Sequence, residues 1–481
     1  MQNSKTVYPS HIKLYNMKNI KIWLLILAVA FSGVACEKDF DQINTNPNRP
    51  EVVPATNILL SAVSQGIRRT HGASMNMTYA GLWAQHYAKI QYIDEDWYEY
   101  RPDAFDGHWQ GLYAGPLADL QAILDKEPAQ SNMRAAAMTM RAYYFAILTD
   151  MWGDVPYSEA LAANRGIFQP KYDSQEEIYA NLIAELKSAA DMFGQGDALG
   201  AGDIIYGGDV ALWKKFANSL RARLLNRAKH KNAAYASELQ SLLNAPGALI
   251  SSNAENARIT YPDPTVNANP IYSNKYNDGR DDHAVSKTLV DLLAGDPRLS
   301  VYAEKNGTGG YVGQPNGTTE PSPFSAVSRI GAAFRDDPAA PSYLMTYAEV
   351  LFIQAEAKSD KQAYLDGIAA SCAQNGVSAD AAFLASAAAA YDAGAAKAVG
   401  NQKWLALFGD GCEAFTEFRR TGHPSTVVEV PGTAYPGQGV PRRFGYAVSE
   451  TGNNKVNLES AIQRQKIDAS GLFGDKMWWA L

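Results

Sequence analysis

Aromatic and charged side chains gather in the stretch of chain from Gln91 to Trp109. Flat aromatic rings can stack on the apolar C–H faces of sugars, and carboxylate, amide and guanidinium groups can satisfy sugar hydroxyls. The high charge and weak periodicity of this stretch indicate that some of its rings lie outside the core. We therefore predict ligand contact for three of them: Trp97, Tyr98 and Tyr100.

A second candidate lies in the Pro-, Asn- and Tyr-rich stretch from Tyr261 to Asn277, where Tyr272 and Tyr276 could contact a ligand. Exposed aromatic residues in loops are typical of binding sites. Trp109 and Tyr113 are assigned to packing instead, because they stand four residues apart on an expected helix.

Motifs for catalysis are missing from the sequence. It has no His-Glu-x-x-His, Cys-x-x-Cys or Gly-x-Ser-x-Gly pattern. A glycosidase needs two carboxyl groups roughly 5–10 Å apart, whereas the run Asp94-Glu95-Asp96 is interpreted as a solvated acidic loop. The segment from Asn277 to Asp282 offers oxygen ligands for Ca²⁺ but lacks the spacing and closing Glu of an EF-hand loop. We expect no catalytic residue, no bound metal and no cofactor.

Several charged or sulfur-bearing residues remain open to more than one interpretation. Glu349 and Arg419 fall on expected helices, where paired charges that hold helices together are the favoured interpretation. The pair Arg442-Arg443 could bind an anion or form salt bridges from a loop to a helix. Cys372 and Cys412 could form one disulfide if they meet in the fold.

Helical periodicity and capping signals predict a mainly α fold with little β-structure. The expected helices begin at Ser131, at the capping box Ser174–Glu177, at Asp209, at Pro341-Ser342, at Ala381, and at Gln402 with a break around 409–411. The first should end at Gly153 and the third at His230. Residues 261–277 and 306–341 are expected to form long loops, and residues 426–430 a brief strand.

The N-terminus has the layout of a lipoprotein signal peptide. Lys18 and Lys21 precede an apolar run that ends with small residues before Cys36, and the run is too short for a permanent membrane span. We predict a signal peptide over residues 1–35, lipidation of Cys36, and one ligand-binding domain over residues 36–481.

The net charge of −7, without a basic tract, argues against nucleic acid as a partner. After the signal region no run of 18 apolar residues is present. A hydrophobic content of 46% is enough for a sizeable core.

A series of short motifs resembles the SusD/RagB-type nutrient-binding outer-membrane lipoproteins. The motifs occur in this order: Asn44-Thr45-Asn46-Pro47-Asn48, Trp109 to Pro116, Asp150 to Tyr157, Tyr206 to Asp209, Trp213 to Arg221, Asp296 to Leu299, Met345 to Val350, Trp404 to Phe408, Glu413 to Phe415, Arg419 to Gly422, and Pro441 to Arg443. They cover nearly all of the chain after Cys36.

The resemblance implies tetratricopeptide-like helix pairs joined to a large loop-rich, irregular half. It also implies a lid for a SusC-like TonB-dependent transporter, which captures oligosaccharide, or in some members peptide, for import. Acidic residues after Cys36, such as Glu37 and Asp39, resemble the signals that place lipoproteins on the cell exterior.

Three functions stay open at this point. The first is binding of oligosaccharide or peptide by a surface lipoprotein. The second is a surface glycoside hydrolase, which would turn its glycan over and lose activity when one acidic residue is neutralised. The third is a helical-repeat scaffold that binds only proteins, for which an exposed apolar groove is expected.

Overall fold

The structure is a computed structural model that describes residues 53–261, 263 and 266–481. The predicted signal peptide, Cys36 and the Asn44–Asn48 motif lie outside the described residues. Residues 55–481 form one compact unit. Within the described part of the chain, no helix combines the length and the apolar character that a membrane crossing requires.

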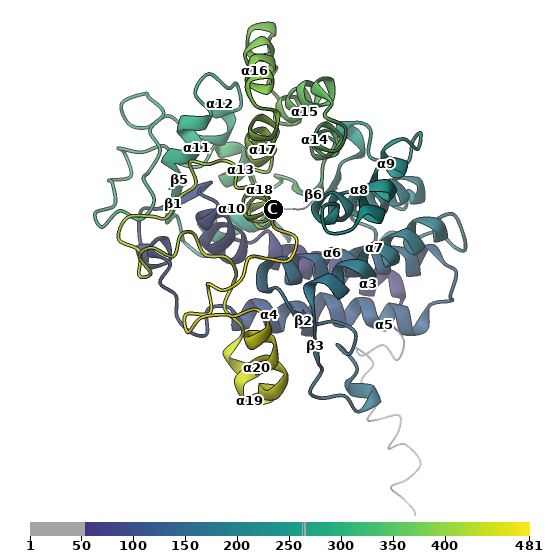
Figure 1. The fold of residues 1–481 in the computed structure, drawn as a ribbon. Coiled ribbons are helices and arrows are strands. Elements are labelled where there is room, and N and C mark those ends of the chain that lie inside the picture. Colours follow the sequence, from purple (N-terminus) through teal and green to yellow (C-terminus); the bar gives the residue numbers. More distant parts are fainter. Residues whose placement is uncertain (1–52, 262, 264–265) are drawn as a thin grey trace, which may run out of the picture. The chain divides into compact units, whose positions relative to one another are not determined.

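Packed helices form most of this unit, so the predicted mainly α fold class is confirmed (Figure 1). The long helices of the first half are α3 (Ala55–Thr70), α5 (Ala118–Lys126), α6 (Asn132–Trp152), α7 (Gln175–Met192), α8 (Val210–Ala228) and α9 (Ala233–Leu243). Those of the second half are α14 (Tyr347–Lys358), α15 (Lys361–Gln374), α16 (Ala381–Ala393), α17 (Ala395–Ala406), α18 (Gly411–Thr421) and α20 (Lys455–Arg464). Consecutive helices pack on one another from α5 to α9 and from α14 to α17, as expected for tetratricopeptide-like helix pairs.

Side-chain caps fix the helix starts that the sequence predicts. Ser131 accepts a hydrogen bond from the Arg134 amide at the start of α6. Ser174 and Glu177 form the predicted capping box of α7. Asp209 accepts bonds from the first amides of α8. These groups satisfy amide donors that the first helical turn leaves unpaired.

Some predictions about elements are wrong. Residues 342–345 form a strand rather than the start of a helix, because they pair with residues 257–259, and Thr346 caps α14 instead. Residues 426–430 form no strand. The stretch 261–277, expected to be a loop, contains α10 (Pro270–Tyr276), whose amides are capped by Asn269.

Short antiparallel ribbons organise the loop-rich half. Strand β1 (Tyr87–Lys89) pairs with β5 (His283–Val285), β2 (Val155–Pro156) with β3 (Tyr172–Asp173), and β4 (Ala257–Ile259) with β6 (Ser342–Met345). In the first ribbon Lys89 lies opposite His283. The remaining elements are η1 (Ala73–Gly81), η2 (Ile93–Trp97), α4 (Asp106–Leu112), η3 (Tyr113–Leu117), η4 (Ala163–Arg165), η5 (Asn253–Glu255), α11 (Lys287–Leu292), α12 (Leu299–Tyr302), α13 (Ala332–Arg335) and α19 (Val448–Asn453).

Buried ion pairs join the helices. Arg223 of α8 forms a two-pronged contact with Glu349 of α14, at 2.6 and 2.5 Å. One turn later, Arg227 contacts Asp150 of α6 at 2.5 Å and also Glu413 of α18. The predicted pairing of Glu349 is confirmed. Cys372 and Cys412 are buried free thiols, so they do not form a disulfide.

Candidate ligand-binding surface

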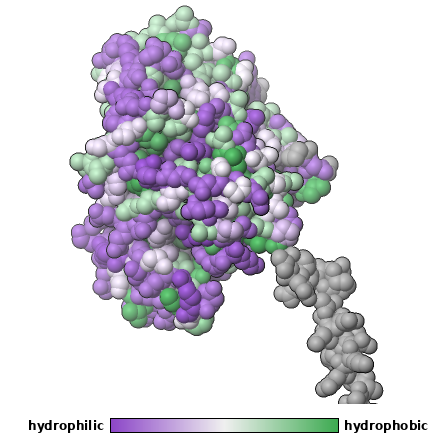
Figure 2. Space-filling view, turned by 90° about the vertical axis from the view of Figure 1, so that its right-hand side faces the viewer, coloured by the Kyte–Doolittle hydropathy of each residue, from purple (hydrophilic) through white to green (hydrophobic). Residues whose placement is uncertain are grey.

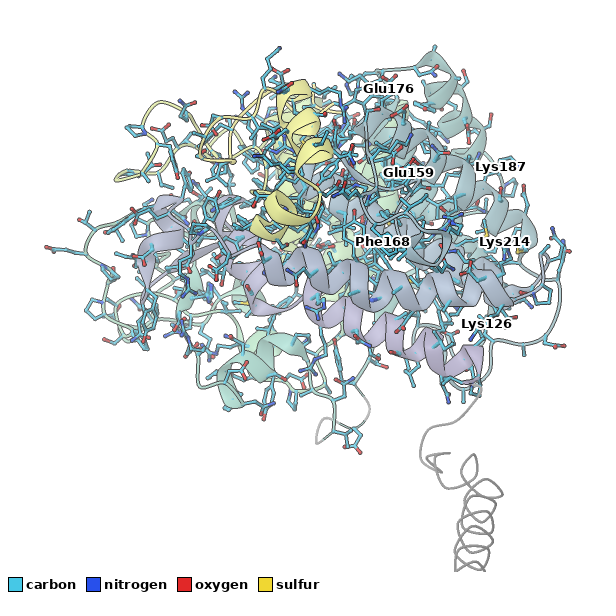
Figure 3. The ribbon with its side chains drawn as sticks, turned by 90° about the horizontal axis from the view of Figure 1, so that it is seen from below. Lys126, Glu159, Phe168, Glu176, Lys187 and Lys214 are labelled. Carbon is cyan, nitrogen blue, oxygen red and sulfur yellow. The ribbon has the colours of Figure 1, made fainter. Side chains whose placement is uncertain are left out.

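Four aromatic side chains of the described residues are exposed: Tyr92 (64%), Phe168 (76%), Tyr276 (51%) and Phe324 (43%). Contacts tie three of them to one segment, residues 270–285, which holds α10 and β5. We call this the aromatic surface and define it as Tyr92, Tyr272, Tyr276 and Phe324 with the cations Arg280 and Arg329. Phe168 belongs to the loop between β2 and β3, on the face seen from below (Figure 3).

Arg280 positions Tyr92 from a distant part of the chain. The guanidinium carbon lies 4.4 Å from the centre of the Tyr92 ring, and Arg280 also pairs with the buried Asp282. Its backbone is fixed on α10, because the Arg280 amide donates to the Asn274 carbonyl at 2.9 Å. A cation over one ring face orients the ring, and the ring still keeps most of its area exposed.

Phe324 is held in the same way. The Arg329 guanidinium carbon lies 4.6 Å from the Phe324 ring centre. Arg329 pairs with Asp281 at 2.5 Å, and Asp281 is the direct neighbour of Arg280 and Asp282 in the chain. Residues 280–282 therefore link both ring–cation pairs.

Tyr272 and Tyr276 stack one turn apart on α10, with ring centres 4.5 Å apart and planes at 27°. The Tyr276 hydroxyl donates to Asp336 at 3.0 Å. Lys275 pairs with the same carboxylate at 2.6 Å. The Lys275 ammonium also lies 4.7 Å from the Tyr276 ring centre. The Tyr272 and Tyr276 rings therefore form a preformed aromatic platform. The Tyr276 hydroxyl and the Lys275 ammonium already have a partner within the protein, the Asp336 carboxylate.

A buried carboxyl anchors the turn that carries Tyr92. Asp96 accepts hydrogen bonds from the Asn316 amide at 2.9 Å and from the Lys89 backbone at 3.2 Å. Burial raises the pKa of Asp96 to about 6. Of the predicted solvated acidic loop, Asp94 is exposed, but Asp96 is only 2% exposed because it ties the turn to β1 and the 316 loop.

The three predicted contact residues of the first stretch lie deeper than Tyr92. Trp97 is half-buried, and its indole N–H donates to the Thr318 carbonyl at 3.3 Å. Tyr100 is half-buried, donates to the Ser470 carbonyl, and has its pKa raised to about 12 by burial. Tyr98 is 1% exposed and accepts a bond from the Val430 amide at 3.3 Å, which leaves no ring face for a ligand.

The two predicted residues of the second stretch lie on the aromatic surface, with Tyr276 exposed and Tyr272 half-buried. Sequence reasoning missed Phe324 and both arginines and did not choose Tyr92. Tyr92 meets Arg280, and Arg329 meets Asp281, from distant parts of the chain, so no local pattern marks these contacts. Trp109 and Tyr113, assigned to packing, have ring centres 5.2 Å apart, and Trp109 is 3% exposed.

The aromatic surface offers stacking and hydrogen bonding but no visible reaction centre. Its carboxylates Asp281, Asp282 and Asp336 are each paired with an arginine or lysine. In the described part of the chain no group of three or more His, Cys, Asp or Glu side chains could hold a metal ion. Figure 2 shows a different face, on the side of α7, α8 and α9, and this face is mostly hydrophilic with scattered apolar residues.

Residues 47–447 match the profile of a SusD-like family, described as starch-binding associating with outer membrane. The chain belongs to this SusD-like family. No protein of curated function matches it by sequence.

Solved SusD-like structures share the fold over most of the chain. A chitin-binding protein is 25% identical, with a TM-score of 0.75 over 89% of this chain and 100% of its own. A chitin-binding SusD homolog from Flavobacterium johnsoniae is 23% identical, with a TM-score of 0.75 over 89% and 97%. A SusD-like protein from Bacteroides thetaiotaomicron is 22% identical, with a TM-score of 0.77 over 89% and 99%.

Proposed function

We propose that this protein captures oligosaccharide on its aromatic surface and does not alter it chemically. The main support for the proposal is that Tyr92, Tyr276 and Phe324 are all linked to residues 270–285. Each of the three rings has a cation over it. Rings held in place before binding lose little conformational entropy when a sugar stacks on them. The printed descriptions of the family and of two chitin-binding relatives support a glycan as the ligand.

The proposed site differs from the one that the sequence favoured. It keeps Tyr272 and Tyr276, adds Tyr92 and Phe324, and leaves out Tyr98. Trp97 and Tyr100 stay as inner neighbours, since each is half-buried with its polar atom bonded to a backbone carbonyl.

We further propose that lipidated Cys36 anchors the protein in the outer membrane facing the cell exterior. There it would hand the oligosaccharide to a SusC-like TonB-dependent transporter. The signal-peptide layout before Cys36 and the outer-membrane association in the family description support this placement. Each acyl chain adds about 0.8 kcal/mol per buried methylene, so several chains give a stable anchor.

The test measures binding of the mature protein to chitin-derived oligosaccharides, starch-derived oligosaccharides and peptides by calorimetry. The proposal expects saturable binding of one glycan class, recovery of that glycan at unchanged length after long incubation, and co-purification of a transporter from membranes. Shortened glycan would show a hydrolase instead. Binding of peptides alone would replace oligosaccharide by peptide as the cargo.

A further inference from the structure

A second cavity lies away from the aromatic surface, where the end of α18 meets residues 427–442 and 476–481. Its volume is about 500 Å³, which is within the range of small-ligand sites. Four cationic side chains line it: Arg419, Arg420, Arg442 and Lys476.

Of these four cations in the described part of the chain, Arg420 alone lies within ion-pair distance of Asp or Glu side chains. Arg420 pairs with Glu356 and Glu417, both at short distance. Within the described residues, no carboxylate oxygen lies within 4.0 Å of the side-chain nitrogens of Arg419 or Arg442. Their hydrogen bonds go to neutral oxygens instead. The predicted ion pairing of Arg419 is therefore wrong, and so is the salt-bridge alternative for Arg442.

Arg419 is held rigidly beside Arg442. Its guanidinium carbon lies 3.9 Å from the Phe415 ring centre and 5.3 Å from that of Trp479. One of its nitrogens donates to the Arg442 carbonyl at 2.8 Å. Burial lowers the pKa of Arg419 to about 9. It is still a cation at neutral pH, and Asp150, the carboxylate that most favours its charge, is already paired with Arg227.

Arg442 and Lys476 have donor capacity to spare. The Arg442 side chain donates to the Gly474 carbonyl, although a guanidinium carries five N–H donors. Lys476 is exposed and donates at 2.8 Å to a main-chain oxygen of Leu481, the last residue of the given sequence. The acidic side chain that lines the cavity, Glu429, accepts hydrogen bonds from the amides of Gly437 and Gly439, at 2.9 and 2.6 Å. These amides hold the Glu429 pKa below its usual range.

We infer that this cavity binds a small oxyanion, a carboxylate or sulfate group, with Arg442 and Lys476 contacting it and Arg419 positioning Arg442. Guanidinium groups match the planar geometry of such oxygens and form strong charge-assisted hydrogen bonds with them. The cavity volume leaves room for a sugar ring behind the anionic group. The oxyanion can thus be a free ion or the acid group of a charged sugar.

The test titrates sodium sulfate, glucuronate and neutral glucose into the mature protein at low ionic strength, followed by calorimetry. We expect saturable binding of at least one anion, no binding of glucose at this cavity, and weaker binding as salt rises. Sulfate binding alone identifies the free ion or a sulfate ester, and glucuronate binding identifies an acidic sugar.

Variants locate the site. Arg442→Gln and Lys476→Gln should each weaken anion binding about tenfold, since hydrogen bonds to charged groups contribute about 1.5–3 kcal/mol. Lys214→Gln, an equal charge change on the exposed side of α8 (Figure 3), should bind like the wild type. Lys476 is exposed, so its variant should fold even if Arg442→Gln does not.

Two results would overturn the inference. One is the absence of saturable binding by either anion. The other is unchanged binding in both cavity variants. Tyr92→Ala should leave anion binding intact, which separates this site from the aromatic surface.

Discussion

Tyr92 and Tyr98 stand at the two ends of the same short turn, and both have left-handed backbones. Tyr98 is surrounded by core residues such as Trp83, whose ring centre is 6.3 Å away. Tyr92 is in contact with Arg280 and is otherwise exposed. At the scale of single residues, the partner of each ring thus decides whether it belongs to the core or to the surface.

This contrast gives a stability prediction. Tyr98→Ala should lower the free energy of unfolding by about 3–5 kcal/mol, as for other large aromatic residues lost from a core. Tyr276→Ala should change it by less than about 1 kcal/mol, because the Tyr276 ring is half exposed. Urea unfolding of both variants measures the difference. Equal losses would mean that Tyr276 is as important for folding as Tyr98.

Asp96 gives a pH-dependence prediction. Its pKa is raised to about 6 in the folded protein by burial, so the folded state binds a proton that the unfolded state has already released. Protonated Asp96 therefore contributes to the free energy of unfolding. This contribution is complete below the pKa of about 4 in the unfolded state, and it is lost as the pH rises through the folded-state pKa of about 6. At most about 3 kcal/mol is involved, since one pKa unit corresponds to about 1.4 kcal/mol.

Asp96→Asn should remove this dependence. The stability of the wild type relative to the variant should therefore fall between pH 4.5 and 7.5, as measured by urea unfolding at each pH. A constant difference between the two proteins across this range would show that Asp96 does not titrate there.

The candidate site could be predicted only in part, for reasons visible at single residues. The exposure of Tyr276 is consistent with its place in a Pro- and Asn-rich stretch, although Tyr261 of the same stretch is 3% exposed and packs in the core. Phe324 and Arg329 cannot be chosen in this way. Their arrangement depends on the ion pair between Arg329 and Asp281, which are distant in the sequence. Tyr98 was misassigned because a charged neighbourhood in sequence does not reveal that the fold turns one ring inward.

At the scale of elements, α8 connects three helices through its arginines. Arg223 and Glu349 have side chains 5% and 2% exposed, so neither charge has water as an alternative partner. Arg223→Met would leave Glu349 buried without its main cation. The cost should be about 3–5 kcal/mol of unfolding free energy.

Lys187→Met provides the matched control. Lys187 of α7 pairs with Asp191 at 2.5 Å, but both side chains are more than half exposed. Its loss should change stability by less than about 1 kcal/mol in the same urea experiment. If the two variants lost equal stability, burial would not be what makes the Arg223 pair important.

The helices themselves were largely predictable because their signals are local. Ser131, Ser174 and Asp209 mark helix starts within one turn of the residues that they cap. Gly394 divides the Ala-rich stretch into α16 and α17, although a single helix was expected. Strand β6 was missed because its partner β4 lies far away in sequence, and pairing over such a distance leaves no mark in a short window.

At the scale of the whole molecule, the proposed function includes a tether at the N-terminus of the helical unit. Cys36→Ser should release the protein from the membrane fraction, because lipid attachment needs the cysteine thiol. The variant should still bind glycan with unchanged affinity, since residues 55–481 form a compact unit of their own. Fractionation and metabolic labelling with a fatty acid check this. Membrane retention without label would contradict the proposed anchor.

Paired alanine variants of the mature protein test whether the aromatic surface binds oligosaccharide. Calorimetry with the best-binding glycan compares Tyr92→Ala/Tyr276→Ala with Phe168→Ala, which removes an even more exposed ring outside the surface. We predict a loss of about tenfold or more for the double variant, as two stacking contacts of about 1 kcal/mol each are removed, and no loss for Phe168→Ala. Wild-type affinity in the double variant, or an equal loss in Phe168→Ala, would contradict the account.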